Sequence, residues 1–94
     1  MFDKTATCRV VVARPAGLHA RPSLAIAETV RRFRSRVVVR SGKDEADAAS
    51  VLELLSLGAG QGQELTLTAK GPDADQVLEA LRQLFAHDFG MGDE

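Results

Sequence analysis

The spacing of apolar residues changes abruptly around residues 14–17. Residues 5–13, TATCRVVVA, place apolar side chains on one side at a period of two, which predicts a strand with one buried face. Residues 20–32 instead follow a period of about 3.6, which predicts an amphipathic helix with Ile26 and Val30 on its buried stripe. Because proline and glycine favour turns, the segment RPAG between them separates the two elements. The chain therefore needs both a sheet and helices.

The remaining pattern predicts two strands, a short helix, a fourth strand and a long helix. These are expected at residues 36–41, 44–48, 51–57, 63–69 and 73–87, with a frayed tail at residues 89–94. Amphipathic helices combined with half-buried strands imply a two-layer α+β domain, with helices on one face of a mostly antiparallel sheet. We expect residues 1–94 to form one domain.

Two serine or aspartate positions carry helix-start signals. Ser50 with Glu53 has the spacing of a capping box, in which the serine hydroxyl and the glutamate carboxylate each accept a backbone N–H at the helix start. Asp73 with Gln76 gives a second capping signal before the last helix.

The number of cysteines and the N-terminal residues indicate the cellular compartment in which the protein is expected. A single cysteine, Cys8, cannot form an internal disulfide and lies in an apolar run, which favours a small buried side chain in a reducing compartment. The first residues do not form a signal sequence, and no apolar run approaches the roughly 20 residues of a membrane span. We expect a cytoplasmic location without membrane insertion.

Charge is distributed unevenly along the chain. Residues 1–43 hold ten Lys and Arg against two acidic residues, whereas residues 44–94 hold two against eleven. Two interpretations remain open: the halves neutralise each other on folding, or a cationic face attracts anionic groups and acidic partners.

Some apolar residues do not fit the predicted buried faces. Leu24 lies off the buried stripe of its helix and aligns with Ala20, one turn from His19. In the short helix, Leu54 and its one-turn neighbour Leu57 project together, and a second group projects to another side. We expect one of the two groups to face solvent or a partner; the second consists of Val51, Leu52 and Leu55.

The stretch AGLHARPS, residues 16–23, places His19 at the predicted start of a helix. Backbone N–H groups there lack intrahelical partners, and the helix dipole adds positive charge, so an anion is stabilised. Gly17 permits a tight turn, Pro22 suits the first helical turn, and Arg21 offers a planar fork of donors to a phosphate. Since the positive field disfavours imidazolium, a neutral His19 nitrogen can attack phosphorus and hold the phosphoryl group.

Other chemistries find less support in the sequence. A metal site needs several ligands, and the other histidine, His87, lies far along the last helix, where a surface role is expected. Nucleic-acid binding on the sheet would need exposed strand aromatics, but the four phenylalanines lie at the ends or on helices. No metal, cofactor or nucleic acid is therefore predicted, and the spacing alone leaves a structural histidine open.

The motif Gly17-Leu18-His19-Ala20-Arg21-Pro22, with Ser50 and the run SLG at residues 56–58 downstream, resembles the HPr family. These proteins are histidine-containing phosphocarriers of the bacterial phosphoenolpyruvate-dependent phosphotransferase system. The resemblance spans almost the whole chain. It implies an open-faced β-sandwich, a four-stranded antiparallel sheet covered on one face by three helices, and a monomer.

The resemblance also implies roles for the motif residues. His19 would accept a phosphoryl group on Nδ1 from phosphorylated enzyme I and pass it to a histidine of a IIA domain in sugar transport, while Arg21 would steady the phosphate. Such a protein is a phosphoryl-transfer intermediate rather than an enzyme with its own turnover. The family docks partners through its first two helices, which here would use Ala20, Leu24, Val51, Leu52 and Leu55.

Ser50 matches a serine that HPr kinase/phosphorylase phosphorylates in many members of the family. Its N-cap position accommodates a phosphate but equally explains an unmodified serine, and Ala49 and Glu53 depart from residues often found there. The alternative function is thus a regulatory binding module controlled through Ser50, or a nitrogen-type phosphorelay rather than sugar uptake.

The loop before Gly17 also departs from the family. Many members carry Asn or Ser there as an extra phosphate ligand, where this chain has Arg14-Pro15-Ala16. The charge of Arg14 is a candidate substitute, and the lifetime of the phosphohistidine depends on whether this loop serves as well.

Overall fold

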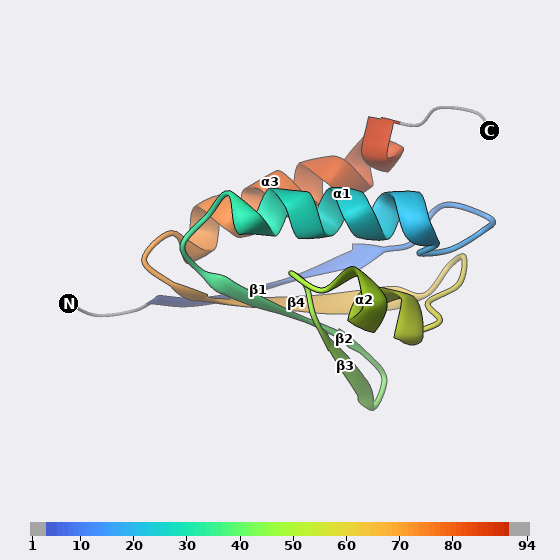
Figure 1. Cartoon of the computed structure of the whole chain (residues 1–94), viewed down its shortest axis with the longest axis horizontal. Coiled ribbons are helices and arrows are strands. Elements are labelled where there is room, and N and C mark those ends of the chain that lie inside the picture. Colours follow the sequence, from blue (N-terminus) through green and yellow to red (C-terminus); the bar gives the residue numbers. More distant parts are fainter. Residues whose placement is uncertain (1–3, 91–94) are drawn as a thin grey trace.

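A four-stranded antiparallel sheet lies beneath the helices in the computed structural model, which describes residues 4–90 (Figure 1). The strands are β1 (Lys4–Val11), β2 (Arg36–Ser41), β3 (Asp44–Asp47) and β4 (Glu64–Gly71), and the helices are α1 (Ala20–Arg31), α2 (Val51–Ser56) and α3 (Ala74–Ala86). A short 3₁₀ turn, η1 (Asp88–Gly90), follows α3. The predicted α+β class and element order are confirmed.

The sheet has the strand order β1-β4-β2-β3, and every neighbouring pair is antiparallel. The strand β4 therefore lies between β1 and β2, the two strands that are furthest from it in the sequence, and it pairs with both. Alternate residues of β2 are buried and exposed, with Val37 and Val39 buried and Val38 at 38% exposure, which places helices on one face and leaves the other open.

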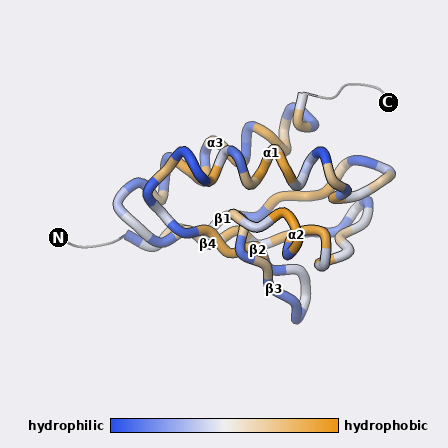
Figure 2. The backbone as a smooth tube through the Cα atoms, viewed as in Figure 1, coloured by the Kyte–Doolittle hydropathy of each residue, from blue (hydrophilic) through white to orange (hydrophobic). Residues whose placement is uncertain are grey.

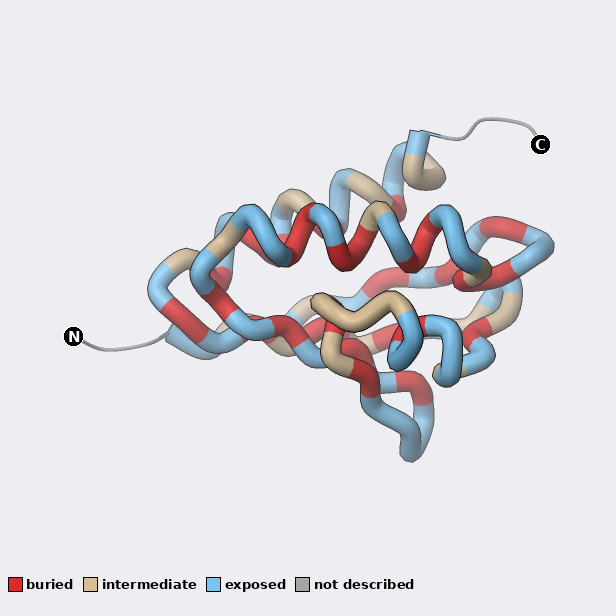
Figure 3. Tube along the Cα trace, in the orientation of Figure 1, coloured by how far each residue is buried: buried red, intermediate tan, exposed pale blue. Residues whose placement is uncertain are grey.

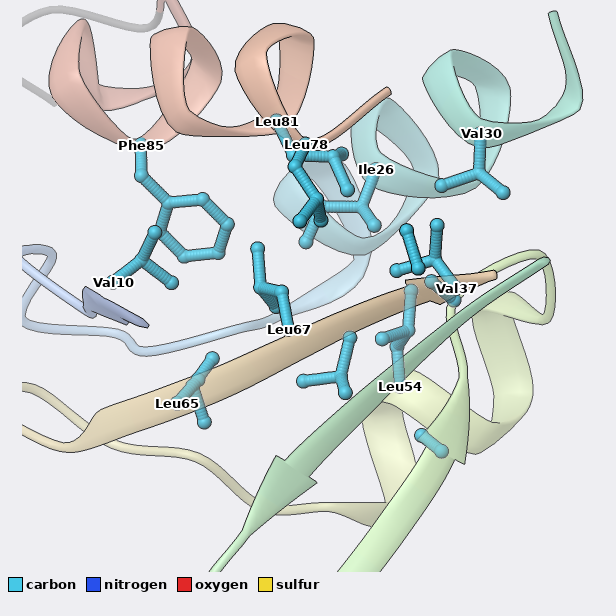
Figure 4. Close-up of a cluster of buried hydrophobic side chains, with 14 of the residues drawn as sticks. Val10, Ile26, Val30, Val37, Leu54, Leu65, Leu67, Leu78, Leu81 and Phe85 are labelled. Atoms are coloured by element: carbon cyan, nitrogen blue, oxygen red, sulfur yellow. The ribbon is translucent and has the colours of Figure 1, made fainter. Parts of the chain in front are cut away.

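An aliphatic core fills the space between the sheet and the helices (Figure 4). Leu65 and Leu67 of β4 point into it, as their alternation predicted, and Ile26 of α1 and Leu81 of α3 meet them from above. Leu54 is the one fully buried residue of α2. These contacts fix α1, and with it the position of its first turn.

Ion pairs within residues 4–90 join the basic first half of the chain to the acidic second half. They are Lys4–Asp75, Arg14–Asp88 and Arg40–Glu45. The fold therefore supports the interpretation that the halves partly neutralise each other.

The two capping predictions were only partly right. The hydroxyl of Ser50 accepts the N–H of Glu53 at 3.2 Å as predicted, but the Glu53 carboxylate accepts the N–H of Asp47 at 2.9 Å. Asp73 makes no side-chain cap on α3; its carboxylate accepts Arg34 N–H and Ser35 O–H instead, at 2.9 and 2.6 Å. In both cases the carboxylate accepts hydrogen bonds from a segment outside the helix that it was predicted to cap.

The expectation of a frayed tail was wrong for residues 89–90. Phe89 packs edge-on against Phe85 with ring centroids 4.8 Å apart, so the end of α3 continues into the ordered turn η1. Residues 91–94 lie outside the described part of the chain.

Candidate active site

His19 is the N-cap residue of α1, and its side chain makes no capping hydrogen bond. The backbone around it is fixed: its N–H donates to the Gly17 carbonyl at 3.0 Å, and its carbonyl accepts the N–H of Ser23 at 3.1 Å, the first bond of the helix. The half-buried imidazole is thus held at the start of a 12-residue helix without being used to close it. An N-cap side chain normally accepts a hydrogen bond from a backbone N–H of the first turn, but the His19 ring makes no such bond.

Pro22 and Ser23 anchor the first turn of α1. Both are fully buried, and the Ser23 hydroxyl donates to the Leu18 carbonyl at 3.3 Å. Proline fits here because the first helical N–H groups have no carbonyl one turn earlier to bond. The turn that carries His19 is therefore rigid on its inner side, as the sequence predicted for Pro22.

Gly17 allows the loop before His19 to approach the segment after α2. Its φ is +71°, and a Cβ built there would lie 2.3 Å from the Ala59 carbonyl oxygen. That same oxygen accepts the N–H of Leu18 at 3.0 Å. Only glycine can take this backbone conformation at such a distance, so the position of His19 depends on the Ala59 segment. No local signal in the sequence indicates this contact.

The two arginines beside the motif lie in different environments. Arg21, two residues after His19, is exposed on the first turn of α1. Arg14 is 6% exposed, and its guanidinium lies 2.7 Å from the Asp88 carboxylate in η1. The structure thus places Arg14 as a buried structural cation, and the idea that its charge serves as a surface phosphate ligand is not supported. The role of Asp88 was missed in the sequence, which predicted no ordered structure near it.

A predicted apolar surface lies on α1 and α2. Leu24 is 46% exposed, Leu52 is 78% exposed and Leu55 is 38% exposed, as their helical positions predicted. Figure 2 shows α2 as an apolar segment, whereas Figure 3 shows much of it exposed. Val51 is half-buried and Ala20 is exposed. Since α1 and α2 contact each other, we call these five residues the α1–α2 apolar surface.

Ser50 lies at the N-cap of α2, half-buried, with its hydroxyl oxygen accepting the N–H of Glu53. The Glu53 carboxylate is drawn toward Asp47 N–H. An unmodified Ser50 therefore already has a structural function as a helix cap.

Cys8 and His87 each have local interactions of their own. Burial raises the pKa of the Cys8 thiol, with the Arg82 guanidinium partly opposing this, and His87 bonds through Nδ1 to the Gln83 carbonyl at 2.9 Å on exposed helix surface. Among residues 4–90, no group of three His, Cys, Asp or Glu could hold a metal ion. Nor is any helix in this part of the chain long and apolar enough to cross a membrane.

The sequence matches a known protein family and several known proteins. A family model described as "PTS HPr component phosphorylation site" matches residues 6–87. Over 71 residues, 76% of the chain, the sequence is 49% identical to a multiphosphoryl transfer protein of Xanthomonas campestris, but it spans only 8% of that protein's length. It is 40% identical over 73 residues to the phosphocarrier protein NPr of Shewanella violacea, which covers 78% of this chain and 80% of that protein.

The fold is also found among solved structures. HPr-C-His from Thermoanaerobacter tengcongensis has a TM-score of 0.87 and 30% sequence identity, covering 95% of this chain and 98% of that one. The predicted open-faced sandwich is therefore confirmed.

Proposed function

Because this chain belongs to the PTS HPr family, we propose that it is a phosphocarrier in which His19 accepts a phosphoryl group from phosphorylated enzyme I and passes it to a histidine of a IIA domain. The proposal treats residues 1–94 as one HPr domain acting in the bacterial cytoplasm. We propose no metal or cofactor bound to this chain.

The proposal rests on one observation: His19 occupies the N-cap position of α1, but its imidazole makes no capping hydrogen bond. A histidine that only filled a corner would be buried or would bond the helix end. This ring is half-buried and held at the end of α1 that carries positive partial charge. It is therefore available to a phosphoryl donor that approaches from solvent.

The chemistry follows from what the first turn of α1 offers to an anion. A neutral ring nitrogen, Nδ1 by family resemblance, attacks phosphorus, and the bond between phosphorus and the donor atom breaks as the new P–N bond forms. The phosphoryl oxygens then lie by the helix N-terminus, where the dipole and the guanidinium of Arg21 offset their charge. Because the site is at the surface, the group is stabilised and still accessible for transfer.

The α1–α2 apolar surface is proposed as the docking site for enzyme I and IIA domains. Leu52, at 78% exposure, is the most exposed of its large side chains. Apolar residues on a small surface helix, next to a reactive histidine, suit repeated association with partners. The chain itself is proposed to act as a monomer.

Incubation with phosphoenolpyruvate and enzyme I tests the proposal. We expect one acid-labile, base-stable phosphoryl group in the wild type and none in His19→Ala. An unmodified wild type, or a His19→Ala variant that is still labelled in the same way, would overturn it.

The pathway is a separate question, because the relatives include a nitrogen-type phosphocarrier and the structural match is an HPr. We propose sugar uptake as the first output, with a nitrogen-type regulatory relay as the alternative. Parallel phosphorylation by sugar-type and nitrogen-type enzyme I separates them: the physiological partner is expected to give the higher kcat/KM.

Regulation through Ser50 is the second candidate function. The observation that favours it is the position of the hydroxyl at the N-cap of α2, directly before the half-buried Val51 and the exposed Leu52. A phosphate there would add two negative charges beside the proposed docking surface and alter partner binding. HPr kinase/phosphorylase with ATP is expected to modify the wild type but not Ser50→Ala; an unmodified wild type rejects this switch.

A further inference from the structure

Arg14 is a buried cation in the loop that leads to His19. Its side chain is 6% exposed, and its terminal nitrogen donates to an Asp88 carboxylate oxygen at 2.7 Å. Burying an arginine is costly unless an opposite charge accompanies it, so a loop that only needed to turn would not hold one here. The ion pair therefore joins two segments that lie 74 positions apart in the sequence.

The segment that supplies Asp88 adopts an uncommon backbone conformation. Asp88 and Phe89 have φ values of +51° and +58°, a region that side chains other than glycine's rarely occupy. Phe89 is held there by its edge-on contact with Phe85 at the end of α3. Strained conformations of this kind persist where the surroundings require them, and here the result is a carboxylate turned toward Arg14.

The backbone of Arg14 also belongs to the turn that leads to His19. Its carbonyl accepts the N–H of Gly17 at 3.0 Å, which closes the turn, and the next N–H, that of Leu18, bonds to Ala59. The loop is thus tied on one side to the segment after α2 and on the other, through the Arg14 side chain, to η1. A displacement of Arg14 would therefore also shift His19, because only this short turn separates the two residues.

We propose that Arg14 and Asp88 are positioning residues for phosphoryl transfer, because their ion pair holds the loop of residues 14–18 so that the His19 ring keeps its reactive orientation. The inference rests on the proposed function of His19 but assigns a new task to two residues that do not belong to the motif. Neither touches the phosphoryl group; each acts through the loop.

Asp88→Asn is the most direct test, since asparagine tolerates a positive φ and still offers an oxygen to Arg14 while losing the charge. We expect kcat for phosphorylation by phosphorylated enzyme I to fall by roughly 10- to 100-fold, the size of effect that small misplacements of reacting groups produce. KM is expected to stay unchanged because the α1–α2 apolar surface is untouched. Arg14→Met should give a similar loss, and the double variant should be no worse than either single variant.

The control is Asp75→Asn, which breaks the exposed ion pair with Lys4 and should leave kcat unchanged. Arg14→Lys keeps the charge and should recover part of the activity that Arg14→Met loses; urea unfolding identifies any variant that does not fold. A folded Asp88→Asn with wild-type kcat would overturn the inference while leaving the proposed function intact. A wild type that enzyme I does not phosphorylate would overturn both.

Discussion

Replacing Gly17 with alanine is expected to destabilise the fold through a specific clash. The new Cβ would lie 2.3 Å from the Ala59 carbonyl oxygen and 3.1 Å from the Gly60 Cα, so the loop or its neighbour must move. An alanine at φ +71° costs about 1–2 kcal/mol. Loss of the hydrogen bond from Leu18 N–H to that oxygen adds about 1 kcal/mol. We therefore expect the free energy of unfolding to fall by about 2–3 kcal/mol.

Gly42→Ala is the matched control for this prediction. Gly42 has a similar φ of +62°, but no atom of the described chain lies within 4 Å of its added Cβ. Only the conformational cost remains, about 1–2 kcal/mol. Urea unfolding of both variants should separate them by about 1 kcal/mol, the contribution of the lost hydrogen bond, and only Gly17→Ala should slow phosphorylation of His19. Equal stabilities and equal rates would refute the close approach of this loop to Ala59.

Three further substitutions test separate parts of the molecule. Arg21→Ala should slow phosphotransfer at least several-fold while changing stability by less than about 1 kcal/mol, because an exposed guanidinium adds little to folding; an unchanged rate rejects its role. Leu52→Gln should raise KM for enzyme I and alter stability by no more than about 0.5 kcal/mol, and an unchanged KM removes Leu52 from the docking surface. The Ser35 hydroxyl and the Arg34 N–H hold the pKa of Asp73 below its ordinary value of 3.8, so its ionised form stabilises the fold above that pH and this contribution is lost as pH falls through the lowered pKa. Asp73→Asn should therefore lower stability at neutral pH and lose less on acidification, and an acid unfolding curve parallel to that of the wild type contradicts this.

The local part of the site could be predicted from the sequence. His19 at a helix start follows from the change of apolar spacing, and Pro22 marks the same turn within three residues. The exposure of Leu24 and Leu52 follows from helical periodicity in the same way. Each of these predictions depends on residues close together in the chain, where spacing determines geometry.

The parts that were missed depend on how separate elements pack together. Nothing near Asp88 indicates that its carboxylate meets Arg14, because the pair forms only when the end of α3 packs beside the loop after β1. Glu53 has the spacing of a capping box, but its carboxylate accepts the N–H of Asp47, at the end of β3, in place of the predicted N–H at the start of α2. The Arg14–Asp88 contact spans 74 positions, so no short window of sequence contains it, whereas the Glu53–Asp47 contact spans few positions but depends on how the chain turns between β3 and α2.

The most direct measurement follows radiolabelled phosphate from phosphoenolpyruvate through enzyme I to this chain and then to a IIA domain. The proposed function predicts that the wild type carries acid-labile label and delivers it to the IIA domain, whereas a folded His19→Ala variant neither carries nor delivers it. A wild type that remains unlabelled, or a His19→Ala variant that delivers label at the wild-type rate, would contradict a phosphocarrier built on His19.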